Sequence, residues 1–219
     1  MNADYDRSAT KALEILIENK IAETPIDTLS IILKHPGVRV MSFTSFAMNA
    51  EMERHELVPL FGANQDAATF HLNMQINDVE YIVVYNKRLP HEIIMRGLAR
   101  ELGHIVLGHD GETRPTEVRM AEAMTFAHHL ISPRPVLNLL RNAFPLTMNV
   151  LTDTTGCSDD CVEELRQLPA VHVPAEYNRK VRDLFAPGIK EYIMFNKSST
   201  KEDNSAVVDL GSYMEGYEE

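Results

Sequence analysis

Residues 98–109 read LARELGHIVLGH, and they close a helical pattern that begins at His91. Apolar side chains recur in this pattern at spacings of three and four residues, at Ile94, Leu98, Leu102 and Ile105. Such a period is typical of an amphipathic α-helix with one buried face. Pro90 can open the helix, because proline is tolerated in the first turn, and Gly108 lies near its end. The sequence therefore predicts a helix over His91–Leu107.

The polar positions of this helix come close to a known metal-binding pattern. A helix that carries H-E-x-x-H places two histidines on one face, where they bind Zn²⁺, and its glutamate acts as general base on the metal-bound water. Glu101 and His104 occupy the glutamate and the second histidine, but Arg100 occupies the first. A guanidinium stays charged and has no lone pair to give a metal. The stretch thus has the frame of a zinc metallopeptidase with a substitution that should impair it.

Two quoted stretches carry a closer resemblance. Residues 99–109 read ARELGHIVLGH, and residues 122–133 read EAMTFAHHLISP. They resemble the ImmA/IrrE family of metallopeptidases, whose members show A-H-E-L-G-H-x-x-L-G-H followed by E-A-N-x-F-A-x-x-L-L-x-P. The strand-like run Tyr81–Asn86 also fits, and the resemblance covers roughly residues 10–165.

The resemblance assigns roles to individual positions. It implies that His104 is a zinc ligand, that Glu122 is the third ligand and that Glu101 is the general base of an active member. Arg100 occupies the position of the first ligand, and Met124 replaces the usual asparagine. His109 matches a family position that is not expected to bind metal.

Other histidines could replace the lost ligand. His91 precedes Arg100 on the same predicted helix, about 13 Å along its axis, which is far for a shared metal. His129 follows Glu122 by two turns on the same face, and His128 points elsewhere. We expect each of the three to be a solvated helix residue. The remaining histidines outside the motif are treated as structural, namely His35, His55, His71 and His172.

The rest of the chain predicts the α+β class. We expect a small antiparallel sheet packed on a helical body, with the former zinc helix beside its edge strand. The predicted strands are Val38–Ser42, Ala68–Met74 and Val79–Asn86, and the predicted flanking helices run from about Ser8 to Lys20, from Asp27 or Thr28, and from near Thr113 to Ile131. Met48–Leu60 fits a helix or a loop.

Three segments are predicted along the chain. Residues 1–135 form the metallopeptidase-type domain, residues 136–195 form a helical extension packed on it, and residues 196–219 form an acidic tail that we expect to be mobile. Within the extension, Cys157–Leu168 has the shape of the turn and second helix of a helix-turn-helix, but its helix is acidic rather than basic.

Composition argues against several classes of protein, namely nucleic-acid-binding, membrane-spanning and secreted ones. The 219 residues carry a net charge of −11, which argues against a general nucleic-acid surface. No apolar run approaches the roughly 20 residues that span a bilayer, and no secretory signal is readable, so we expect a cytoplasmic protein. Cys157 and Cys161 are too few for a disulfide framework. We expect them to be small half-buried apolar side chains, although four residues apart they could meet.

Two classes of function remain. The first is an active zinc-dependent endopeptidase that cleaves a transcriptional repressor and uses a substitute metal ligand. The second is a non-catalytic or weakly active regulator with a degenerate zinc site. It would bind a partner protein, such as the helix-turn-helix repressor of a phage or another mobile element. We favour the second, because Arg100 removes one of three protein ligands.

Overall fold

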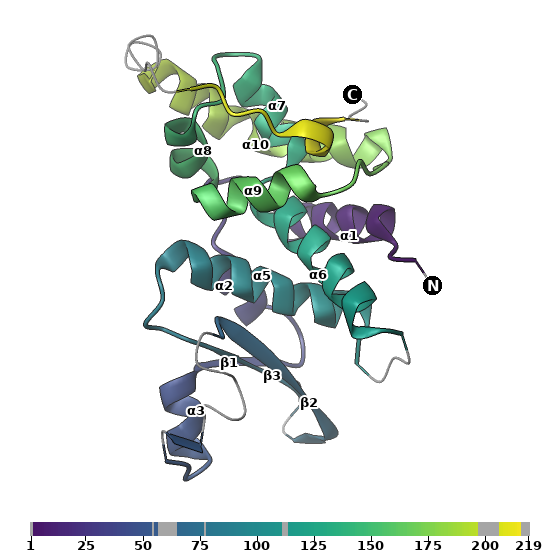
Figure 1. Cartoon of the computed structure of the whole chain (residues 1–219), viewed down its shortest axis with the longest axis vertical. Helices are drawn as coiled ribbons and strands as arrows, with labels where there is room; N and C mark the ends of the chain where they lie inside the picture. Colours follow the sequence, from purple (N-terminus) through teal and green to yellow (C-terminus); the bar gives the residue numbers. More distant parts are fainter. Residues whose placement is uncertain are drawn as a thin grey trace. The chain divides into compact units, whose positions relative to one another are not determined.

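A computed structural model describes residues 2–53, 55–56, 65–76, 78–110, 114–196 and 206–215, without the side chains of residues 73–76 (Figure 1). The chain forms two compact units. We call Asp27–Thr113 the sheet unit, and Met1–Ile26 together with Arg114–Glu219 the helical unit. This division cuts across the predicted segments, because the first helix of the chain packs with helices from its second half.

The sheet unit holds three strands in the order β1-β3-β2. The strands are β1 (Val38–Ser42), β2 (Ala67–Ile76) and β3 (Val79–Tyr85). The prediction of a small sheet with a helical body is confirmed, but the sheet is mixed rather than antiparallel. The short β2–β3 turn forces an antiparallel pair, whereas the chain between β1 and β3 is long enough to return and pair them in parallel.

The two faces of this sheet contact different helices. Helices α2 (Thr28–Leu33) and α5 (His91–Leu107) lie over one face (Figure 1), and α5 contacts β3 and the edge strand β2. Helix α3 (Phe43–Asn49) packs with residues of the other face, including Phe70, Ile82 and Val84. Because side chains alternate along a strand, Thr69 and His71 of β2 point to the opposite side from Phe70.

Helix α5 has the predicted bounds. It begins after Pro90 and ends at Gly108, whose φ of 71° is a left-handed conformation that glycine adopts without strain. Helix α3 begins before the segment Met48–Leu60 that we left undecided, and residues 54 and 57–60 of that segment lie outside the described residues. The Asn77 position of the predicted turn also lies outside them.

The helical unit is built on α1 (Tyr5–Glu18) and α6 (Thr116–Ile131), which pack against each other. It also contains α7 (Arg134–Arg141), α8 (Met148–Thr155), α9 (Asp159–Gln167), α10 (Ala175–Asn196) and the 3₁₀ turn η1 (Gly211–Met214). Helix α1 begins three residues earlier than predicted, because the side chain of Asp4 accepts a hydrogen bond from the backbone N–H of Arg7.

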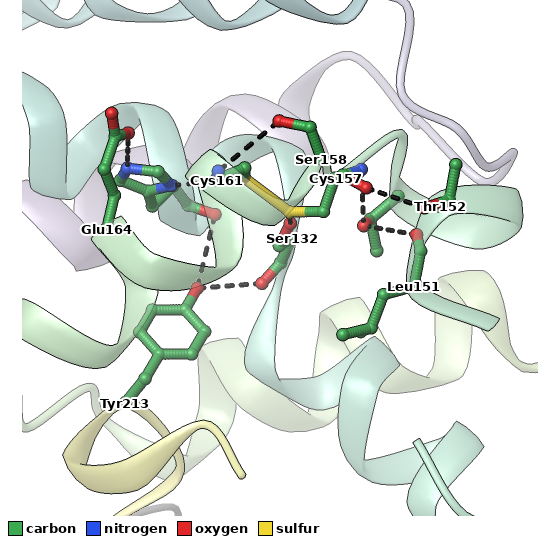
Figure 2. The surroundings of a disulfide bond; sticks show 10 residues. Ser132, Leu151, Thr152, Cys157, Ser158, Cys161, Glu164 and Tyr213 are labelled. Carbon is green, nitrogen blue, oxygen red and sulfur yellow. Dashed lines mark hydrogen bonds and ion pairs between the residues drawn. A yellow bond between two sulfur atoms is a disulfide. The ribbon is translucent and has the colours of Figure 1, made fainter. Parts of the chain in front are cut away.

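Cys157 and Cys161 form a disulfide (Figure 2), so our expectation of two separate half-buried side chains was wrong. Cys157 lies in the turn before α9, and Ser158 caps that helix, which brings the two Cα atoms to 5.3 Å. Both cysteines are buried. The spacing was compatible with this pairing, but only the turn geometry decides it.

Residues 206–215 of the C-terminal segment make contacts within the helical unit, and the mobility of the tail stays a prediction. The hydroxyl of Tyr213 lies 2.8 Å from the carbonyl oxygen of Ser132 and 3.2 Å from that of His128 (Figure 2). Arg134 is 1% exposed and donates to the carbonyl oxygens of Glu215 and Val171. These backbone acceptors come from far along the chain, so composition alone did not reveal them. Within the described residues, no helix is long and apolar enough to cross a membrane.

The buried hydroxyl of Tyr213 gives a test of this packing. Tyr213→Phe should lower the free energy of unfolding by about 1–2 kcal/mol, because a buried carbonyl loses its donor. Urea unfolding measures this, with Tyr177→Phe as the control, since the Tyr177 hydroxyl bonds to Glu14 in a less buried place and should cost less. Equal effects of the two substitutions would show that residues 206–215 do not pack stably.

Candidate functional site

Helix α5 presents three of the four predicted site residues on the sheet unit. Arg100 and Glu101 lie in its middle and His104 one turn later. Glu101 is 5% exposed and Arg100 is partly buried, so neither is an ordinary surface side chain. The apolar positions that predicted the helix pack inward and place this polar group beside β2.

Arg100 is held by two carboxylates of the same unit. Its Nη1 and Nη2 donate to the two oxygens of Asp66 at 3.1 and 2.8 Å, which is a bidentate pair. Its Nη2 and Nε also donate to Oε1 of Glu101 at 2.7 and 3.1 Å. Nη2 further donates to the carbonyl oxygen of Ala67 at 3.1 Å. Burial alone would lower the pKa of Arg100, but the hydrogen bonds and charges of Asp66 and Glu101 outweigh it and raise that pKa.

Gly97 makes room for the Asp66 carboxylate. It lies one turn before Arg100 on α5, and a Cβ atom there would come within 2.8 Å of Oδ2 of Asp66. Any side chain at this position would push the carboxylate away from the guanidinium. The Asp66–Arg100 pair therefore requires a glycine at position 97.

Both oxygens of Glu101 are engaged. Arg100 donates to Oε1, and the hydroxyl of Thr69 donates to Oε2 at 2.8 Å. Thr69 belongs to β2, so the carboxylate bonds α5 to the sheet. A glutamate that acts as a general base needs a free oxygen near the reacting water. In this arrangement Glu101 instead holds a cation and a hydroxyl.

His104 is oriented by its neighbour His109. Their Nδ1 atoms lie 2.8 Å apart, so one ring donates and the other accepts. His109 is 2% exposed and follows the Gly108 turn. When His104 is the donor, its Nε2 carries the lone pair that a metal requires. His109 thus orients a potential ligand, which agrees with its family position.

Glu122 belongs to the helical unit, where it has its own arginine. Its Oε1 accepts from Nη1 of Arg114 at 2.7 Å and from the backbone N–H of Asp4 at 2.7 Å. Glu122 is 1% exposed. Since Asp4 caps α1, this carboxylate fixes the start of α1 against α6. The predicted role of Glu122 as a metal ligand stays a prediction.

We had expected the proposed substitute ligands on α6, His128 and His129, to be solvated. This was wrong, because both are buried. His128 is bonded through Nε2 to Glu164 at 3.0 Å, and its Nδ1 faces the sulfur of Cys161. Nδ1 of His129 lies 3.1 Å from the carbonyl oxygen of Thr125. Burial and the charge of Arg134 hold the pKa of His129 well below its usual value, so its ring is neutral. His91 is exposed, as expected.

The sequence did not reveal the partners of the site residues. Asp66, Thr69 and Arg114 lie outside the quoted motifs, and their pairing depends on contacts 8 to 34 residues apart. The only local signal was Gly97, a glycine inside a helical pattern, which often marks a close approach of another group.

Comparison with known families confirms the resemblance. The sequence model of the IrrE N-terminal-like domain, a peptidase M78 family, matches residues 53–158, which include Arg100, Glu101, His104 and Glu122. No curated protein and no solved structure matches the chain.

The Asp66–Arg100 pair can be measured directly. Arg100→Ala should lower the free energy of unfolding by about 1–3 kcal/mol, because Asp66 and Glu101 lose their cation in a largely buried place. Arg100→Lys should cost less, since it keeps the charge but not the bidentate geometry.

A double-mutant cycle with Asp66→Ala isolates the pair. The loss for the double variant should be smaller than the sum of the single losses by more than about 0.5 kcal/mol. Additive losses would mean that the two side chains do not interact in solution.

Proposed function

Residues 53–158 belong to the IrrE N-terminal-like domain family of metallopeptidases, and we propose that this protein is a non-catalytic or weakly active member with a degenerate zinc site. In this proposal it acts as a regulator that binds a partner protein. The observation that carries the proposal is the set of contacts made by Arg100 on α5. The partner is a protein such as the helix-turn-helix repressor of a mobile element, which active relatives are associated with cleaving.

Arg100 supports loss of the metal in two ways. It supplies no lone pair at the position of the first ligand, and its five hydrogen bonds hold a positive charge beside Glu101. A catalytic zinc takes three protein ligands and a water. At the family positions only one imidazole and one carboxylate remain, and this donor set does not fit a catalytic zinc.

The carboxylates support the same conclusion. Glu101 is paired with Arg100 and Glu122 with Arg114. In an active enzyme, one would contact the metal-bound water and the other the metal itself. An arginine on each carboxylate supplies the positive charge that a metal would otherwise provide. The two carboxylates of the family motif are kept, and arginine side chains balance their negative charges.

The alternative is an active endopeptidase with a substitute ligand. His104 favours it, because His109 orients its ring as a ligand would be oriented. His128 and His129 favour it less, since both are buried with partners inside the helical unit. These contacts therefore favour the regulator, and the following experiments distinguish it from the endopeptidase.

Zinc titration by calorimetry on the metal-stripped full chain tests the degenerate site. In the wild-type background, His104→Ala should leave zinc binding unchanged, because the family site holds no zinc. Arg100→His should add a site, and adding His104→Ala or Glu122→Ala to that variant should remove the gain.

Two outcomes would contradict the proposal of a degenerate zinc site that can be restored by Arg100→His. If His104→Ala weakens zinc binding of the wild-type protein, the family site holds metal and the endopeptidase alternative gains support. If Arg100→His adds no binding, the site has drifted beyond its first ligand. Circular dichroism of each variant checks that the fold is kept.

The regulator role is tested with the repressor encoded nearest to this protein. We expect a complex by calorimetry and no cleavage of the repressor by wild-type protein with Zn²⁺, as followed by gel electrophoresis. Cleavage that requires Zn²⁺ and disappears in Glu101→Gln would establish the endopeptidase instead. Absence of any complex would refute the proposed partner.

A further inference from the structure

Three potential metal ligands converge on the sheet unit outside the family motif. His71 lies on β2, Glu80 lies on β3, and Asp110 follows the Gly108 turn that ends α5. One ligand atom from each lies within 4.8 Å of the others. We had treated His71 as structural, because nothing around it in the sequence suggested a partner.

We propose that His71, Glu80 and Asp110 bind a divalent transition metal of the zinc type, at a site separate from Arg100, Glu101 and His104. The metal would join β2, β3 and the end of α5. This proposal does not rest on the proposed function.

The distances suit a shared ion better than direct pairing. Nε2 of His71 is 3.6 Å from Oε1 of Glu80 and 3.7 Å from Oδ2 of Asp110. Both distances exceed those of a charge-assisted hydrogen bond, about 2.7–2.9 Å. Donors about 2.1 Å from a tetrahedral metal lie about 3.4 Å apart, so small movements would complete the geometry.

The charge and the type of donor select the class of ion. With neutral His71, two carboxylates face each other around an imidazole, and a divalent cation would offset their repulsion. One nitrogen and two carboxylate oxygens form a set that suits zinc and its neighbours, whereas Mg²⁺ and Ca²⁺ prefer oxygen alone. The three side chains are 26–39% exposed, so water can reach the ion and fill its remaining positions.

Tyr81 lies beside the three proposed ligands. Its hydroxyl is within reach of the carboxylates of Asp110 and Glu80 and can donate its single proton to one of them, and its ring centroid lies 5.2 Å from that of His71. A buried donor that orients carboxylate ligands is a common feature around bound metals.

Zn²⁺ titration of the metal-stripped full chain by calorimetry tests the site. Wild-type protein should bind one Zn²⁺ that excess Mg²⁺ does not displace. His71→Ala and Asp110→Asn should each weaken this binding by more than about tenfold, since each removes a ligand. His35→Ala is the matched control, a half-buried histidine of the same unit, and should bind as wild type. His104→Ala should also bind as wild type.

A second readout does not depend on variants. Co²⁺ added to wild-type protein should broaden the ring resonances of His71 in nuclear magnetic resonance spectra before those of His35. Unchanged Zn²⁺ affinity in His71→Ala, or no broadening of His71, would overturn the proposal. Loss of binding in His104→Ala with normal binding in His71→Ala would also overturn it, because the ion would then lie at the family motif.

Discussion

A guanidinium that is largely removed from water must be surrounded by acceptors, because it cannot lose its charge. Arg100 meets this requirement with Asp66, Glu101 and the carbonyl oxygen of Ala67. These contacts bond the middle of α5 to the start of β2. Position 97 has to be a glycine, and Asp66 has to lie directly before β2. The need of the Arg100 guanidinium for acceptors therefore accounts for the local arrangement where α5 contacts the start of β2.

The same requirement bears on the proposed loss of zinc. A metal site concentrates carboxylates, and those carboxylates repel one another when no cation is present. Arg100 and Arg114 each supply a cation to one of them. Under the proposed function, the substitution that removes a ligand thereby also removes the electrostatic penalty of a site without metal. His104 keeps the partner that orients it, so the helix retains a ligand geometry beside a basic side chain.

The helical unit satisfies its buried polar groups in a different way. His128, Arg134 and Tyr213 are buried, and they find partners in a carboxylate and in backbone carbonyls from distant parts of the chain. Residues 206–215 are included in this network, although their composition suggested a mobile segment. A buried polar group without a hydrogen-bond partner lowers the free energy of unfolding. These contacts therefore favour one position of residues 206–215 within the helical unit.

The sequence by itself determined α5, with its bounds, the α+β class and the family, because helical periodicity, proline and glycine signals and the motif are all local. It also predicted a site at Arg100, Glu101, His104 and Glu122, which stays a prediction. It did not determine that β1 pairs in parallel with β3, that Asp66 and Thr69 bind the α5 residues, or that His71 meets Asp110. These features depend on which distant segments come together, and burial and hydrogen bonding decide that only once the chain is folded.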